Sequence, residues 1–110
     1  LKDLEKQLAR THLDGIVDIA PRPTGDVSLL EAARMWGPDK IVMGGIDATA
    51  FTTLTPEQMK DYVREFLREV APGKHFALGS GDAIPLHTPP EVLRAVGEVV
   101  AEEGAYPLSG

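Results

Sequence analysis

One short segment gathers glycines with hydroxyl and acidic side chains: Leu78-Gly79-Ser80-Gly81-Asp82-Ala83-Ile84-Pro85. Paired glycines let a ligand approach the backbone where a bulkier residue would clash. Ser80 and Asp82 carry the polar groups that could act on that ligand, so they are our catalytic candidates. The alternative is conformational, with the glycines in turns and both polar side chains bonded to turn amides. The binding candidates from this region are Gly79, Gly81 and His87.

Two further apolar runs are followed by polar residues. Asp18 lies near the end of the first run, and Arg22 lies in the turn that follows it. Arg22 could bind a substrate carboxylate with its planar guanidinium, or it could be a solvated loop residue. Asp47 follows the second run and could be either a site carboxylate or an Asx turn at a helix start. The binding candidates from these two segments are Asp18, Arg22, Gly44, Gly45 and Asp47.

The histidines do not share a metal-ligand spacing. His12 falls in a predicted helix, His75 begins a predicted strand, and only His87 lies near candidate carboxylates. We therefore predict no metal site made by these residues alone. No Lys-Ser/Thr pair follows the glycines, so a phosphate-binding P-loop is excluded as well.

The composition describes one ordinary globular domain. The chain has 110 residues, of which 43% are hydrophobic and 25% charged, with a formal net charge of -6. That charge gives no attraction to nucleic acid or anionic membranes, so neither is an expected partner. The absence of cysteine fits a cytoplasmic protein without disulfides. The start at Leu1, without Met or an apolar signal core, leads us to expect a preceding segment.

The elements that must position these residues alternate between strands and helices. Apolar runs predict strands at Gly15–Ile19, Lys40–Gly44 and His75–Leu78. Helical periodicity and capping patterns predict four helices. The first has Leu1, Leu4 and Leu8 on one face and stops at Asp14-Gly15; the second starts at Asp26 or at Ser28 with Glu31 and closes at Gly37-Pro38; the third starts at Thr55-Pro56-Glu57-Gln58 and stops at Pro72-Gly73; the fourth starts at Thr88-Pro89-Pro90-Glu91 and ends near Gly104.

The connections between the predicted strands are too long for hairpins and contain helices, which favours a parallel α/β sheet. The carboxyl ends of its strands would share one polar rim. Three strands suit a small open sheet or part of a barrel. An open sheet would leave edges and one face uncovered, so we predict the last three βα units of a (β/α)₈ TIM barrel, preceded by one helix. Residues 1–110 would then be the C-terminal portion of the barrel domain. Alone, such a fragment should be inactive and should associate through its apolar sheet face, with its missing N-terminal part or as a homodimer.

Three ordered blocks of residues resemble the uroporphyrinogen decarboxylase superfamily. They are Gly25-Asp26-Val27 with Leu30-Glu31-Ala32 and Trp36-Gly37; Met43-Gly44-Gly45-Ile46-Asp47; and Leu78 to Pro85 with Thr88-Pro89-Pro90-Glu91. The resemblance implies a (β/α)₈ barrel whose mouth receives a tetrapyrrole or a corrinoid-linked methyl carrier. It also implies that the arginines and the key aspartate for decarboxylation come from N-terminal units.

Three functions follow from the resemblance. One is cofactor-free decarboxylation of porphyrinogen acetates to methyls in tetrapyrrole biosynthesis. The second is methyl transfer between a corrinoid protein and a thiol, which would need zinc. The third is a non-catalytic barrel that binds a tetrapyrrole or a partner protein. Ser80 stands where the resemblance places the histidine of a Gly-His-Gly loop in the decarboxylases and a cysteine ligand of zinc in the methyltransferases. Gly45 stands where many decarboxylases have asparagine. Serine supplies neither imidazole chemistry nor a thiolate.

Overall fold

The computed structural model describes residues 1–36, 39–70 and 76–105. Three predicted features, Gly37-Pro38, Pro72-Gly73 and His75, lie outside the described residues. The chain divides into two compact units. A sheet unit comprises Leu1–Ala48 with Lys74–Ala83, and a helical unit comprises Thr49–Gly73 with Ile84–Gly110.

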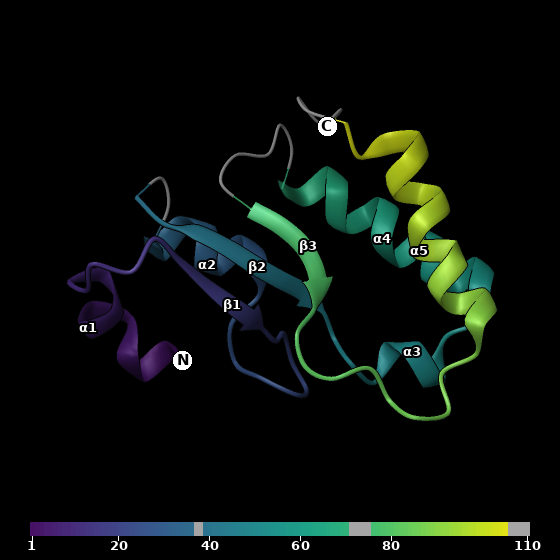
Figure 1. The fold of residues 1–110 in the computed structure, drawn as a ribbon, viewed down its shortest axis with the longest axis horizontal. Coiled ribbons are helices and arrows are strands. Elements are labelled where there is room, and N and C mark those ends of the chain that lie inside the picture. Colours follow the sequence, from purple (N-terminus) through teal and green to yellow (C-terminus); the bar gives the residue numbers. More distant parts are fainter. Residues whose placement is uncertain (37–38, 71–75, 106–110) are drawn as a thin grey trace. The chain divides into compact units, whose positions relative to one another are not determined.

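The sheet unit contains three parallel strands in the order β1-β2-β3 (Figure 1). They are β1 (Gly15–Ile19), β2 (Ile41–Ile46) and β3 (Phe76–Ser80). The predicted parallel α/β sheet is therefore confirmed. Strands β2 and β3 both run two residues further than predicted, because Gly45 pairs with Gly79 and Ile46 with Ser80. The glycine-rich sequences had suggested loops at those positions.

Helix α2 (Leu29–Trp36) begins with a reciprocal capping box. The backbone amide of Glu31 donates to Ser28 Oγ at 3.1 Å, and the Ser28 amide donates to Glu31 Oε1 at 3.4 Å. Of the two predicted starts, Ser28 is the one used. The Asp26 carboxylate instead accepts a hydrogen bond from the backbone amide of Lys2 at 3.4 Å.

The two faces of the sheet differ. Strand β2 buries Val42 and leaves Ile41 and Met43 exposed by 52% and 42%, and Val17 of β1 is 61% exposed. Helix α2 packs against β2. The buried apolar residues described in this unit are Ile19, Val27, Leu29, Ala32, Trp36, Val42, Ile46 and Ala48. One sheet face thus belongs to the core, while the other carries exposed apolar side chains.

The N-terminal helix is shorter than predicted. It consists of a 3₁₀ turn, Lys2–Leu4, and α1 (Glu5–Ala9), instead of reaching Asp14. The Thr11 amide and hydroxyl both bond to Leu8 O, which tightens the last turn. The carbonyls of Thr11 and Leu13 accept hydrogen bonds from Lys40 Nζ. Because Lys40 directly precedes β2, these bonds hold residues 11–13 beside the start of that strand, and the helix does not continue through them.

The helical unit contains α3 (Ala50–Thr53), α4 (Pro56–Val70) and α5 (Pro90–Glu103). Helices α4 and α5 lie side by side (Figure 1). The short α3 was not predicted, because four residues show no helical periodicity. The buried apolar residues of the two long helices are Met59, Val63 and Leu67 on α4, and Val92, Ala95 and Val99 on α5. None of the described helices has the length and apolar character needed to span a membrane.

The two long helices begin differently despite similar sequences. Gln58 N donates to Thr55 Oγ1 at 3.2 Å and Thr55 N to Gln58 Oε1 at 2.9 Å, so the predicted capping box of α4 is confirmed. The prediction that Thr88 caps α5 is wrong. Pro89 is the N-cap and no side chain caps it, while the Thr88 hydroxyl donates to Pro85 O at 2.7 Å. Helix α5 ends at Gly104 as predicted, with the Gly104 amide bonded to Val100 O.

This difference gives a testable prediction. Replacing Thr55 by Ala should lower the free energy of unfolding by about 1 kcal/mol, because an N-cap side chain is lost. Replacing Thr88 by Ala should cost less than about half of that amount, because only one turn hydrogen bond is lost. Urea denaturation of the two variants checks the order, and equal costs would contradict the assignment of Thr55 as the cap.

Candidate functional site

The loop after β1 is tied to the end of β2. The hydroxyl of Thr24 donates a hydrogen bond to Asp47 Oδ1. Asp47 is only 6% exposed, although it follows directly after the last residue of β2. Because buried carboxylates are costly unless hydrogen-bonded, this contact fixes the position of the loop that carries Arg22.

The segment after β3 packs against the end of β1. The Gly81 amide donates to Ile46 O of β2 at 2.8 Å. A Cβ added to Gly81 would lie 2.6 Å from Ala20 Cα and 2.8 Å from Ile19 O, so only glycine allows this approach. The carboxyl ends of all three strands therefore meet, as expected for a parallel sheet.

Ser80 and Asp82 both take part in the turn after β3. The Asp82 amide donates to Ser80 Oγ at 3.4 Å, and the Ala83 amide donates to Asp82 Oδ1 at 2.6 Å. Asp82 is exposed and Ser80 half-buried. These bonds correspond to the conformational alternative and hold both groups at the strand end. Their catalytic role stays a prediction.

Backbone conformation and close packing explain why β2 contains glycines, which the sequence did not reveal. Gly44 and Gly45 adopt φ values of 135° and 103°. A Cβ on Gly44 would meet Ile19 O at 2.5 Å and Ile19 N at 2.6 Å. By contrast, Gly79 has only the Met43 side chain near its Cβ position, at 3.5 Å or more. Ligand binding by these glycines stays a prediction, but Gly44 and Gly81 are required by the packing of strand ends.

Arg22 has an acidic neighbour on its own chain. Its Nη1 lies 3.7 Å from Glu31 Oε1, and the side chain is largely exposed. A hydrogen bond from Lys2, assisted by the Ser28 amide, lowers the pKa of Glu31. The Arg22 guanidinium and the Glu31 carboxylate therefore form a charged pair beside the loop that follows β1.

The remaining predicted binding residue, His87, belongs to the helical unit and is exposed. His12 is exposed too, in the segment before β1. Over the part of the chain that the structure describes, no three His, Cys, Asp or Glu side chains are grouped as metal ligands. The strand-end donors of the sheet unit are the Ser80 hydroxyl and carboxylates, which do not make the thiolate and imidazole set that zinc prefers.

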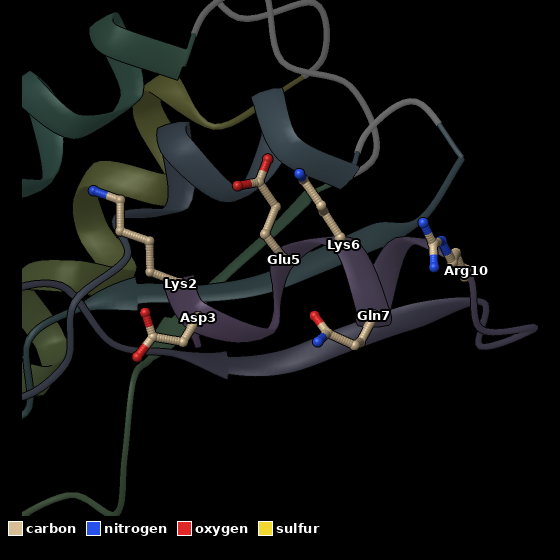
Figure 2. A pocket seen from close by; sticks show the side chains of 6 residues that line it. All are labelled: Lys2, Asp3, Glu5, Lys6, Gln7 and Arg10. Carbon is tan, nitrogen blue, oxygen red and sulfur yellow. The ribbon is translucent and has the colours of Figure 1, made fainter.

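Two surface hollows lie away from these residues. One, of about 340 Å³, surrounds the N-terminal turns, and its six side chains fan out without converging on a point (Figure 2). The other, of about 360 Å³, lies between α4 and α5. Neither is lined by a predicted site residue. The lining residues are Lys2, Asp3, Glu5, Lys6, Gln7 and Arg10 for the first, and Pro56, Lys60, Glu91, Arg94, Ala95 and Glu98 for the second.

Sequence reasoning missed Thr24, which holds Asp47. A hydroxyl residue in a Pro- and Gly-containing loop has no pattern that distinguishes a partner across the sheet from an ordinary turn residue.

Comparison with protein families decides the relationship. Residues 8–103 match the family described as uroporphyrinogen decarboxylase (URO-D). The chain belongs to this family. The match spans β1 to β3 and the segment that follows each of these strands. The resemblance of the sequence blocks to uroporphyrinogen decarboxylases is therefore confirmed. No curated protein and no solved structure matches the chain significantly.

Proposed function

We propose that the protein is a uroporphyrinogen decarboxylase-like enzyme that removes carboxyl groups from the acetate side chains of a porphyrinogen. The observation that carries this proposal is the match to the uroporphyrinogen decarboxylase family over residues 8–103. It is supported by the meeting of three strand ends, which is where parallel α/β enzymes place ligands.

The chain would supply the last three βα units of a (β/α)₈ barrel. Three observations support this arrangement: β1 and β3 are both edge strands, Val17, Ile41 and Met43 are exposed on one sheet face, and α2 packs against β2. Exposed apolar side chains on a sheet usually contact further protein. The missing N-terminal part of the same barrel is the partner that we propose for this face.

The reaction defines what the rim must provide. Protonation of a pyrrole carbon makes the ring an electron sink; the bond between the acetate methylene and its carboxylate then breaks, and carbon dioxide leaves. Protonation of the methylene carbon and loss of the added proton from the ring carbon then give a methyl on a neutral pyrrole. Groups that favour the protonated ring and cations that hold the carboxylates are required. On this chain Arg22 is the strand-end cation we propose for a carboxylate, whereas Asp18, Asp47 and Asp82 are acidic. Most of the carboxylate-binding cations must therefore come from elsewhere in the protein.

Ser80 favours one second candidate, a barrel that binds a tetrapyrrole without chemistry. Its hydroxyl cannot replace an imidazole as a proton carrier near neutral pH. The methyltransferase alternative is less well supported, because neither a hydroxyl nor the neighbouring carboxylate replaces a thiolate ligand of zinc.

Turnover by the full-length protein tests the proposal. With uroporphyrinogen kept reduced, we expect release of carbon dioxide and products with fewer carboxylates. Ser80→Ala and Asp82→Asn should each lower kcat/KM about tenfold or more, because the first removes a hydroxyl and the second a negative charge at the rim. A tenfold loss corresponds to about 1.4 kcal/mol.

Glu57→Gln is the matched control, since it removes an exposed carboxylate from α4, a helix that carries none of the predicted site residues. It should leave kcat/KM unchanged. Uroporphyrin binding without decarboxylation would favour the binding-only barrel, and methyl transfer from a corrinoid protein would favour the methyltransferase. Unchanged turnover and affinity in both rim variants would refute the roles of Ser80 and Asp82.

A further inference from the structure

The loop after β1 contains a closed turn that carries an arginine. The Gly25 amide donates to Pro21 O at 2.9 Å, which closes the turn Pro21–Gly25 around Arg22. A Cβ added to Gly25 would lie 2.1 Å from Ala20 O, so the turn folds back on the residue that follows β1. Two prolines restrict the backbone of this turn further. Arg22 is therefore presented from a backbone with little freedom.

The strand that leads into this turn is irregular. Asp18, one residue before the end of β1, has φ of 59°, a region that aspartate tolerates better than most residues with a Cβ. Ile16 pairs with Val42 and Ile19 with Gly44, so β1 has one more residue than β2 between these pairs. A bulge bends the strand that contains it. Regular sheet geometry therefore does not by itself determine where the turn lies.

Thr24 supplies a contact that fixes the turn on the neighbouring strand. Its hydroxyl donates to Asp47 Oδ1, and Asp47 follows directly after β2. Thr24 itself is exposed, whereas Asp47 is only 6% exposed. A hydrogen bond to a carboxylate that is shielded from water is stronger than one between neutral groups in water. The turn is therefore held by the end of β2 as well as by β1.

The Arg22 side chain is held less firmly than the turn that carries it. Its Nη1 lies 3.7 Å from Glu31 Oε1, beyond the usual length of a hydrogen bond, and the side chain is 64% exposed. Glu31 also contacts Lys2 Nζ at 3.3 Å and accepts a hydrogen bond from the Ser28 amide. The place of the guanidinium therefore depends mainly on the backbone of the turn, and its exposed N–H groups can bind a ligand carboxylate.

We propose that Thr24 is a positioning residue: by bonding the turn to Asp47, it places Arg22 where the guanidinium can bind a substrate carboxylate. This inference rests on the proposed function, in which Arg22 holds a carboxylate of the porphyrinogen. Thr24 does not contact the substrate and acts through Arg22. A planar guanidinium gains most from a fixed orientation, because two N–H groups must meet both carboxylate oxygens together. Loss of the Thr24 hydroxyl therefore weakens carboxylate binding without removing a group that binds.

Binding of uroporphyrin to the full-length protein, followed by quenching of porphyrin fluorescence, tests this inference. Thr24→Val keeps the shape of the side chain but removes the hydroxyl, and should bind uroporphyrin about three- to tenfold more weakly. Thr24→Ser keeps the hydroxyl and should bind within about twofold of the parent protein. Thermal midpoints within about 8 °C of the parent protein show that the variants are folded. Thr24→Ala replaces Thr24→Val if the valine variant does not fold.

A double-mutant cycle with Arg22→Gln tests whether Thr24 acts through Arg22. Arg22→Gln alone should weaken binding about tenfold or more, and Thr24→Val should then have less than about a twofold further effect. Additive losses would overturn the inference, because Thr24 would then act independently of Arg22. Parent-like affinity of Thr24→Val would overturn it too, as would equal losses in Thr24→Ser and Thr24→Val.

Thr52→Val is the matched control, because it removes an exposed hydroxyl from α3, a helix that carries none of the predicted site residues. Its affinity for uroporphyrin should equal that of the parent protein. Parent-like binding by Arg22→Gln would overturn both the inference and the role proposed for Arg22. Failure of the parent protein to bind uroporphyrin would overturn the proposed function itself. The two failures are distinguishable, because only the first leaves binding by the parent protein intact.

Discussion

Gly44→Ala is expected to lower the free energy of unfolding by about 3 kcal/mol or more. The added Cβ would lie 2.5 Å from Ile19 O and 2.6 Å from Ile19 N, and residue 44 has φ of 135°. Strain at such a φ and overpacking against backbone each cost about 1–3 kcal/mol. Because the clash is with backbone atoms of β1, a side-chain rotation cannot relieve it. Urea denaturation of the full-length protein measures the effect.

Gly79→Ala is the matched control on the neighbouring strand. Its Cβ would lie in ordinary contact with Met43 at 3.5 Å, so the cost should stay below about 1 kcal/mol. Equal stability losses in the two variants would contradict the close packing of β1 on β2 at this position.

Lys40→Met is the second substitution with a large expected effect, a loss of about 2 kcal/mol. Lys40 is 5% exposed, and its Nζ donates to Thr11 O and Leu13 O at 2.8 Å each. A methionine fills similar space but leaves two carbonyls without this donor, and hydrogen bonds to charged groups contribute about 1.5–3 kcal/mol. The segment before β1 should loosen, which hydrogen exchange of Thr11 to Leu13 would detect.

Lys6→Met provides the comparison, because Lys6 is exposed on α1. Its stability should change by less than about 0.5 kcal/mol, as at most surface positions. A parent-like stability of Lys40→Met would show that Lys40 does not anchor this segment.

Local signals predicted much of the fold. The run Gly15–Ile19 was placed correctly as β1, since β-branched residues bounded by turn signals favour a strand. The capping boxes at Ser28 and Thr55 were readable because their partners lie three residues away. The prediction that Thr88 caps α5 was wrong, because the helix starts one residue later, with Pro89 as the N-cap. The Thr88 hydroxyl bonds to Pro85 O within the preceding turn instead. Similarly, the N-terminal periodicity could not reveal that Lys40, distant in sequence, would bind the Thr11 and Leu13 carbonyls.

The candidate site was predictable in its location but not in its construction. Parallel order alone brings Asp18, Asp47 and Ser80 to the same end of the sheet. The Thr24 bond to Asp47 and the packing of Gly81 on Ala20 join residues far apart in sequence, and no local pattern encodes such contacts. The conformation of Asp18 depends on an extra residue in the register of β1 with β2, which also requires knowing both strands together.

A crystal structure of the full-length protein with bound uroporphyrin tests most directly whether the three strand ends form a ligand-binding rim. The macrocycle is expected at the carboxyl ends of β1, β2 and β3, against the loop after β1 and the segment Gly79–Ala83. A macrocycle bound elsewhere, with these segments exposed only to solvent, would contradict the account.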